Sequence, residues 1–290
     1  MVNKKNKPKQ KKNKEVLDAE KKNRDYRIYG VKKTTEYLKL KKEVPRPIET
    51  MIEKGGGVLM ISAPPGSGKS NFLVNLFLRE TLLKDEFEGG LYLISPTAKS
   101  DLSSEALVDY CDFVETEMSE ELLEGIYSNI MSVPKEDRLL SCVIMDDCMG
   151  SNAMKQHTIL NKMISSCRHL KTLFVFSTQA VKSINPNLRS CLSHSIVFYQ
   201  PSSKQLNDVI ELHSFMGGED EFYKNYRTAT DKKYGFLLND FRDLKSYAWG
   251  SDLNEPELLW TRYDENGEIV KKDDKKDGMD MVNKGEIKGD

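Results

Sequence analysis

One short loop limits what this chain can fold into more than any other stretch. Residues 63–70 read Ala-Pro-Pro-Gly-Ser-Gly-Lys-Ser, after the apolar run 58–61 and before an apolar-rich stretch that begins at Asn71. A strand, a glycine-bearing loop, Gly-Lys-Ser and then a helix is the setting of a phosphate-binding P-loop, here with Ala63 in place of the first glycine. Small residues let backbone N–H groups converge on phosphate oxygens, and the helix N-terminus adds partial positive charge. The loop therefore predicts a bound nucleoside triphosphate.

Individual residues of this loop have distinct expected tasks. Lys69 is placed to reach the β- and γ-phosphates as a point charge, and the hydroxyl of Ser70 is placed to complete a Mg²⁺ shell. A nucleoside triphosphate and Mg²⁺ are thus the expected ligands, and the ordered motifs given below make that nucleotide ATP. The expected nucleotide contacts are Pro65, Gly66, Ser67, Gly68, Lys69, Ser70 and Asn71.

From Gly55 onward, short apolar runs alternate with amphipathic stretches of helical length. This alternation is typical of βαβ units and a parallel sheet flanked by helices. The expected strands are 58–62, 91–95, 139–145, 172–177 and 195–199. The expected helices are 70–84, 118–130, one capped by Asn152, 203–213 and a second short one, followed by a hairpin that pairs 234–238 with 244–249. The sequence therefore predicts an α/β domain with C-terminal helices and a hairpin.

Two adjacent acids stand where a P-loop enzyme needs a carboxylate. The apolar run 140–145 ends in Asp146-Asp147, which places both acids at the carboxyl end of a buried strand. Asp146 is expected to support the metal ion, and Asp147 to orient or deprotonate the attacking water. Two acids could also simply end a strand in a turn, but their combination with the P-loop favours the catalytic interpretation.

Three further side chains are candidates for catalysis. Gln179 follows the strand 172–177, and it would face the γ-phosphate if that strand lies between the P-loop strand and the Asp-Asp strand. Arg168 and Arg189 are candidates for an arginine supplied to a neighbouring subunit's active site, a group that contributes roughly 10³–10⁵ in rate. Either arginine could equally be a surface ion-pair partner. Lys182, on the loop after this strand, and Lys99 lie on loops at the C-terminal edge of the sheet, where substrate-facing loops are expected.

Charge and composition suggest three regions. Residues 3–14 carry seven lysines and no acid although the net charge is −1, so residues 1–25 are expected to form a disordered basic arm. Such an arm either contacts a phosphate backbone or only keeps the protein in solution. Residues 26–263 are expected to form the ATPase domain, and 264–290 a disordered charged tail. Five cysteines without metal spacing indicate reduced thiols. No apolar run approaches a membrane span of about 18 residues, and no hydrophobic signal core is present.

The ordered set of motifs resembles a known family. The P-loop is followed by Ile94-Ser95-Pro96-Thr97, then Asp146-Asp147, then Arg168-His169 before a strand ending at Gln179, then Asn185-Pro186-Asn187-Leu188-Arg189. This order resembles the genome-packaging ATPases of large double-stranded DNA viruses and virophages, within the FtsK–HerA superfamily. The resemblance covers roughly residues 55–212.

The resemblance implies a RecA-like (ASCE) P-loop NTPase fold and an ATP-driven motor. It also implies metal support from Asp146, a catalytic acid at Asp147, a γ-phosphate sensor at Gln179 and a finger in trans at Arg168, with Arg189 in reserve. Many superfamily members have Glu at the position of Asp147. The implied partners are double-stranded DNA, a viral capsid or portal vertex, and further copies of the chain in a ring of five or six subunits. The implied location is the host cytoplasm, in a virus factory, or the virion.

Other functions share parts of this pattern. A helicase or nucleic-acid remodelling ATPase has the same core, but the sequence offers no candidate strand-separating element. A small-molecule kinase would need an arginine-bearing lid, and a GTPase would need an Asn-Lys-x-Asp motif, whereas residues 161–164 read Asn-Lys-Met-Ile. A nucleotide-gated scaffold that binds ATP with little turnover stays open. The sequence predicts an ATPase, and the resemblance makes DNA its substrate.

Overall fold

The computed structural model describes residues 44–98, 100–148, 158–251 and 255–270. The predicted basic arm, Lys99, Asn152 and most of the predicted C-terminal tail lie outside these ranges. Residues 264–270 are described: Asp264 and Gly267 close a turn, and Tyr263 pairs with Ile269. The three-region division of the chain stays a prediction.

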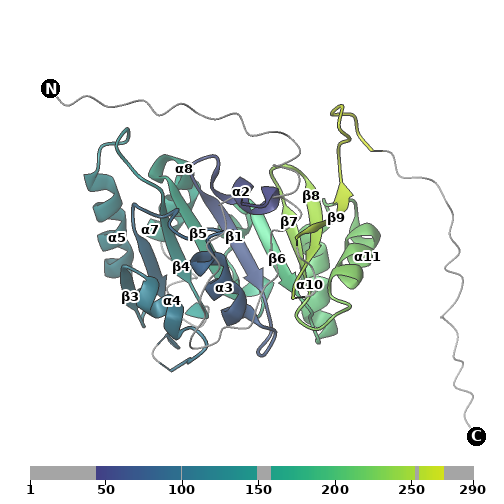
Figure 1. Ribbon diagram of the computed structural model, residues 1–290, viewed down its shortest axis with the longest axis horizontal. Helices are drawn as coiled ribbons and strands as arrows, with labels where there is room; N and C mark the ends of the chain where they lie inside the picture. Colours follow the sequence, from purple (N-terminus) through teal and green to yellow (C-terminus); the bar gives the residue numbers. More distant parts are fainter. Residues whose placement is uncertain (1–43, 99, 149–157, 252–254, 271–290) are drawn as a thin grey trace, which may run out of the picture.

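A nine-stranded sheet organises the molecule (Figure 1). Its order is β3-β2-β4-β5-β1-β6-β7-β8-β9, in which the first six strands run parallel and the last three pair antiparallel. Parallel neighbours need a crossover connection, and here helices supply most of them. The strands are β1 (Gly57–Ser62), β2 (Leu91–Ile94), β3 (Phe113–Glu115), β4 (Ser141–Met145), β5 (Thr172–Thr178), β6 (His194–Phe198), β7 (Phe236–Asp240), β8 (Lys245–Trp249) and β9 (Glu257–Thr261).

Helices cover both faces of the sheet. One face carries α2 (Arg46–Ile52), α3 (Lys69–Leu78) and α4 (Glu105–Tyr110). The other face carries α5 (Glu120–Ser132), α7 (Thr158–Ser165), α8 (Cys167–Leu170), the 3-10 turn η2 (Val181–Ser183), α9 (Pro186–Ser190), α10 (Ser203–His213) and α11 (Glu219–Ala229). The fold is therefore a three-layer α/β arrangement, as the alternating pattern predicts.

The two layers of core divide each strand residue by residue. In β1, Val58 and Met60 pack on the face of the sheet that carries α5 and α7. Leu59 and Ile61 pack on the face that carries α3. Side chains alternate across a strand, so a strand buried on both faces must be apolar at every position. This requirement explains the continuous apolar runs that mark the parallel strands in the sequence.

The structure corrects several predicted boundaries. The helix expected over 70–84 ends at Leu78, because Arg79 is extended (φ −91°, ψ 129°) and the chain turns back to bury Leu82 and Leu83. The hairpin begins at Phe236 rather than Tyr234, whose backbone is left-handed (φ 66°). The elements that were not predicted are α2, α4, β3, α8, η2, α9 and β9. The two strands lie at the sheet edges, where one-sided burial leaves only a weak apolar pattern.

Candidate active site

The order of the strands gathers the predicted catalytic residues at one edge of the sheet. Strand β5 lies between β1, which leads into the P-loop, and β4, which ends before Asp146. This is the position on which the prediction for Gln179 depended, and Gln179 follows the last residue of β5. All three strands are parallel, so their carboxyl ends open on the same crevice, the usual ligand site of such sheets.

Lys69 is the centre of the polar contacts. Its Nζ lies 2.9 Å from Oδ1 of Asp146 and 2.6 Å from Oδ2 of Asp147. The hydroxyl of Ser177, on β5, donates to Asp146 and accepts from the backbone N–H of Asp147 at 3.0 Å and from Lys69 at 3.3 Å. Burial by itself lowers the pKa of Lys69, but the two carboxylates outweigh burial and the net pKa is raised. Lys69 is therefore held as a cation between the P-loop and the acids.

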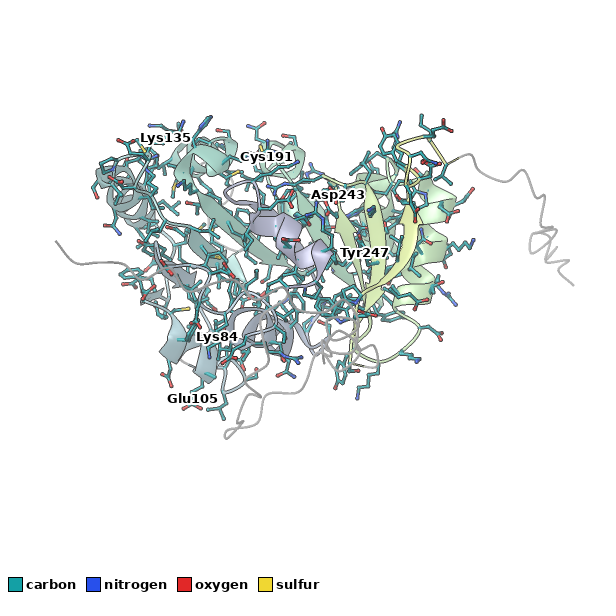
Figure 2. All side chains as sticks on the ribbon, turned by 45° about the horizontal axis from the view of Figure 1, so that its top comes forward. Lys84, Glu105, Lys135, Cys191, Asp243 and Tyr247 are labelled. Atoms are coloured by element: carbon teal, nitrogen blue, oxygen red, sulfur yellow. The ribbon has the colours of Figure 1, made fainter. Side chains whose placement is uncertain are left out.

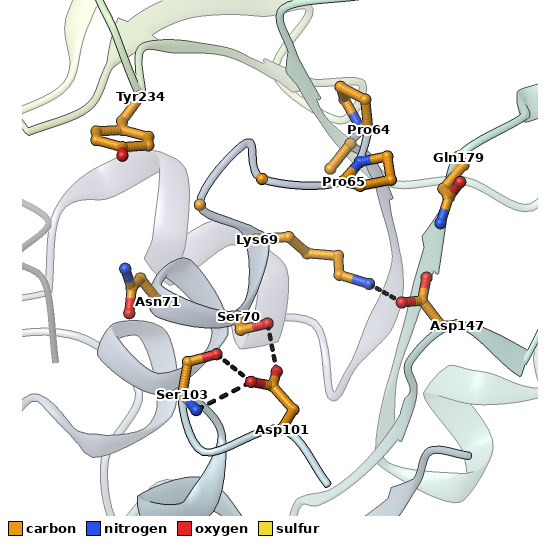
Figure 3. A pocket seen from close by; sticks show the side chains of 13 residues that line it. Pro64, Pro65, Lys69, Ser70, Asn71, Asp101, Ser103, Asp147, Gln179 and Tyr234 are labelled. Atoms are coloured by element: carbon orange, nitrogen blue, oxygen red, sulfur yellow. Dashed lines mark hydrogen bonds and ion pairs between the residues drawn. The ribbon is translucent and has the colours of Figure 1, made fainter. Parts of the chain in front are cut away.

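A third acid, which the sequence analysis missed, approaches from the loop between β2 and α4. The hydroxyl of Ser70 donates to Oδ2 of Asp101 at 3.0 Å, and Asp101 also accepts from the backbone and hydroxyl of Ser103 (Figure 3). Burial raises the pKa of Asp101, but these hydrogen bonds outweigh it and lower the pKa below its ordinary value. Asp101 therefore stays ionised beside the P-loop serine.

Lys69, Ser70 and Asp101 line a cavity of about 380 Å³ whose chemistry fits a triphosphate, while Asp146 and Ser177 contact Lys69 without lining it. Its walls include Gly66, Gly68, Asp147 and Gln179. The helix α3 begins without a side-chain cap at its N-terminus, and the buried hydroxyl of Ser67 has no partner in the described part of the chain. Uncapped helix amides and an unpaired hydroxyl are groups that phosphate oxygens satisfy.

The donor set also fits Mg²⁺. No three acidic, histidine or cysteine side chains in the described ranges form a metal cluster by themselves. Mg²⁺ bound with a nucleotide needs no such cluster, because one or two carboxylates, waters and the phosphates complete its shell. Ser70 and Asp146 would hold the ion, as the sequence predicts, with Asp101 as the hydrogen-bond acceptor of Ser70.

The two predicted arginines lie away from this cavity. Arg168 is on α8, before the first residue of β5, so seven residues of strand, roughly 20 Å, separate it from Gln179. It lines a cavity of about 610 Å³ at the opposite edge of the sheet, together with Lys54 and Arg242. Figure 2 labels Cys191, which also lines that cavity. It lies far from Lys84, which follows α3, and from Glu105, which begins α4. Arg189 is on α9 and does not line the nucleotide cavity. Neither arginine serves the active site of its own chain, and a role in trans stays a prediction.

Of the lysines expected to contact DNA, only Lys182 is described. It lies 2.7 Å from Asp208 and 3.0 Å from Glu211, both on α10. The side chain that was expected to meet phosphates therefore ties η2 to α10. Within the described residues, no helix is long and apolar enough to cross a membrane.

Comparison with known proteins agrees with the motif order. The family model described as the poxvirus A32 protein matches residues 56–234, which is more than half of the chain. The chain belongs to the poxvirus A32 protein family. Members of this family are viral packaging ATPases, so the A32-family chain is an ATPase of that type, and DNA and capsid are the partners that membership implies. The search of curated proteins gave no match.

Solved structures share the fold of this A32-family chain. The genome packaging NTPase B204 from Sulfolobus turreted icosahedral virus 2, in complex with AMP, superposes with a TM-score of 0.51 at 17% identity, over 68% of this chain and 97% of that one. The same protein in complex with sulfate gives 0.50 at 17% identity, over 66% and 95%. The likeness shows that the α/β P-loop fold is common to both proteins.

Three residues of the site escaped the sequence analysis: Asp101, Ser177 and Tyr234. Ser177 had a usable signal, because it is two residues before Gln179 on a strand already expected beside the P-loop. Asp101 and Tyr234 had none, since they lie in loops whose path depends on how α4 and the β7–β8 hairpin pack. All five cysteines are free, as predicted, with Cys142 and Cys148 buried and the others half-buried.

Proposed function

We propose that the chain is an ATP-hydrolysing motor that moves double-stranded DNA into a viral capsid, and that it acts as a homo-oligomeric ring. The observation that supports this proposal best is the convergence of Lys69, Asp146 and Asp147 beside Gln179, within an A32-family fold. The proposed place of action is the host cytoplasm, at sites of virus assembly, or the virion.

In the proposed mechanism, Lys69 exchanges its carboxylate partners for the β- and γ-phosphate oxygens of ATP. Ser70 and Asp146 would hold Mg²⁺, which when bound would supply positive charge to the phosphates. Asp147 lies next to the position that Lys69 leaves, and it accepts the proton of the attacking water. Gln179 hydrogen-bonds to the γ-phosphate. When hydrolysis removes that phosphate, the hydrogen bond at the end of β5 is lost. Arg168 of a neighbouring subunit, or Arg189 in its place, stabilises the charge that develops during transfer.

One experiment tests both parts of the proposal. The ATPase rate is measured without DNA, with single-stranded DNA and with double-stranded DNA, alongside native mass with and without ATP. A motor on duplex DNA predicts an oligomer in ATP whose turnover rises with duplex DNA. A monomer indifferent to DNA would contradict the motor. Preferential stimulation by single strands, with strand separation, would favour a remodelling helicase instead.

A further inference from the structure

Tyr234 lies at the other end of the P-loop from the hydrolytic groups. Figure 3 shows Lys69 extended toward Asp147 and Gln179, while the ring of Tyr234 is on the opposite side of the loop, above Asn71. The ring contacts the loop itself, because a β-carbon added to Gly68 would lie 3.2 Å from Cδ1 of Tyr234. Tyr234 lines the nucleotide cavity and also a second cavity of about 430 Å³, which residues 64–67 of the loop line as well. An aromatic ring thus borders the path that leads out of the phosphate site.

The backbone of Tyr234 is unusual for this residue type. Its φ is 66°, in the left-handed region that glycine and asparagine favour and bulky residues avoid. The side chain is 45% exposed, so burial does not account for its placement. Residues in such conformations concentrate at ligand clamps and switch regions. The placement points to contact with a ligand.

The direction in which a P-loop binds a nucleotide determines which part of the nucleotide reaches this ring. The lysine of the loop contacts the β- and γ-phosphates, so the γ-phosphate lies on the side of Asp147 and Gln179. The α-phosphate, the sugar and the base then leave the loop on the other side, where Asn71 and Tyr234 stand. The ammonium of Lys233 lies 4.9 Å from the ring centroid of Tyr234 and covers one face of the ring. The opposite face of the ring is the one on which the base would stack.

We propose that Tyr234 forms the base-binding subsite, in which its free ring face stacks on the nucleobase of the bound triphosphate. This inference rests on the proposed nucleotide-dependent function and extends it to a part of the ligand that the P-loop does not touch. Every base has a π-face, so stacking holds ATP and GTP alike and does not select between them. The subsite therefore adds affinity for nucleotides over inorganic polyphosphates.

The test separates stacking from support of the loop. Binding of ATP, GTP and inorganic tripolyphosphate is measured by calorimetry for the wild type, Tyr234→Ala and Tyr234→Phe. Stacking on one base is lost in Tyr234→Ala, so its Kd for ATP and GTP should rise roughly tenfold. Its Kd for tripolyphosphate should not change, and Tyr234→Phe should bind all three like the wild type. Alanine and phenylalanine both keep a β-carbon on the same backbone, and Tyr223→Ala, an exposed tyrosine on α11, is the matched control.

Two results would overturn the subsite. Equal loss of ATP and tripolyphosphate in Tyr234→Ala would mean that the ring only supports Gly68, and unchanged ATP binding would mean that the ring does not meet the base. A wild-type protein that binds neither ligand would instead remove the proposed function, and the subsite with it. If Tyr234→Ala does not fold, Tyr234→Trp gives a second measurement: its fluorescence should change with ATP and not with tripolyphosphate, and the reverse would contradict stacking.

Discussion

At the scale of single residues, the backbone of Asp147 explains why this acid is short. Its φ is 52°, in the left-handed region where Asp and Asn are several-fold enriched over longer side chains. Its N–H is fixed by Ser177, and its carboxylate reaches Lys69. A glutamate would have to hold the same backbone at greater cost. The conformation therefore accounts for Asp147 as a local alternative to Glu.

Replacing Asp147 by Asn is the sharpest test of catalysis. Asn tolerates the left-handed backbone and fills the same space, but it cannot accept the water's proton. We expect Asp147→Asn to lower ATP turnover by about a hundredfold or more with little change in ATP affinity, measured by phosphate release and by calorimetry. Asp109→Asn, an exposed acid on α4, is the matched control. Turnover close to the wild type would favour a nucleotide-gated scaffold.

Asp101 gives a second prediction, which concerns the binding of Mg²⁺ and not the hydrolysis step. A hydroxyl can donate its hydrogen to Asp101 while its lone pair faces a metal ion, so Asp101 is a positioning residue for Ser70. We expect Asp101→Ala to raise the Mg²⁺ concentration for half-maximal turnover roughly tenfold, while Asp101→Asn, which keeps an acceptor oxygen, restores most of it. An unchanged Mg²⁺ requirement with slower turnover would count against this role.

At the scale of elements, the β7–β8 hairpin supports the P-loop helix. The ring of Phe72, on α3, lies 5.2 Å from Phe236 of β7 and 6.3 Å from Phe198 of β6, and Phe236 in turn lies 5.8 Å from Trp249 of β8. These four rings are buried, with edge-on and tilted contacts that aromatic pairs prefer. The antiparallel strands thereby extend the surface on which the helix after the P-loop rests.

Truncating the ring at the centre of this cluster should be costly. Phe236 is fully buried, and we expect Phe236→Ala to lower the free energy of unfolding by about 3–5 kcal/mol, measured by denaturant titration. Phe113→Ala, at the edge strand β3 and 37% exposed, should cost markedly less. Similar losses for the two variants would show that the hairpin does not support the core.

The elements differ in how far the sequence predicts them. The strand before the P-loop, the Asp-Asp strand and the strand before Gln179 were predicted because each is apolar on both faces and leads into a recognisable polar group. Helix α10 was predicted over its full length, from Ser203 to His213. The edge strands and α4 were not predicted, since half of their surface faces solvent. The elements α2, α8, η2 and α9 were not predicted because they have three to seven residues, too few to show a helical period. Asp101 and Tyr234 join the site through loop conformation, which no periodicity encodes.

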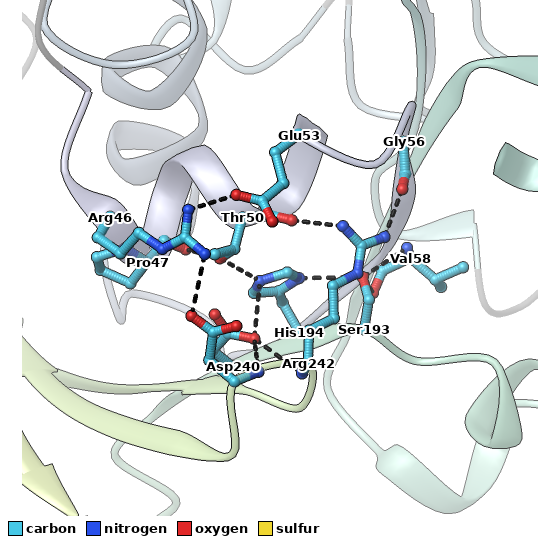
Figure 4. Close-up of polar contacts among 11 residues, drawn as sticks. Arg46, Pro47, Thr50, Glu53, Gly56, Val58, Ser193, His194, Asp240 and Arg242 are labelled. Carbon is cyan, nitrogen blue, oxygen red and sulfur yellow. Dashed lines mark hydrogen bonds and ion pairs between the residues drawn. The ribbon is translucent and has the colours of Figure 1, made fainter. Parts of the chain in front are cut away.

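At the scale of the whole molecule, two buried histidines link stability to pH. Nδ1–H of His213 donates to the carbonyl of Val209, and Nε2 accepts from the hydroxyl of Ser195. Burial lowers the pKa of His213 to about 4. His194 bonds to Thr50 and Ser193 and lies 3.5 Å from Asp240 (Figure 4). Burial lowers the pKa of His194 despite this carboxylate. Both rings are thus neutral in the folded protein at neutral pH.

This linkage predicts loss of stability in acid. The unfolded chain binds a proton at each histidine below about pH 6.5. The folded chain binds one at His213 only near pH 4. As the pH falls from about 6.5 to 4, the free energy of unfolding therefore falls as well. The loss from His213 alone is up to about 3 kcal/mol. Between pH 7 and pH 5, about 2 kcal/mol of this loss should appear in denaturant titrations. His213→Gln should reduce the difference, whereas His169→Gln, an exposed histidine, should leave it unchanged.

The two outer strands of the described sheet, β3 and β9, limit how copies of the chain can contact one another. Strand β3 has three residues, and β9 pairs with β8 through a shift in alignment between Ser246 and Tyr247. Short or irregular outer strands are poor templates for adding another chain's backbone. Subunits that join side by side should therefore touch through helices and loops, which can separate and rejoin as nucleotide turns over, rather than through a continuous intermolecular ladder that would fuse them.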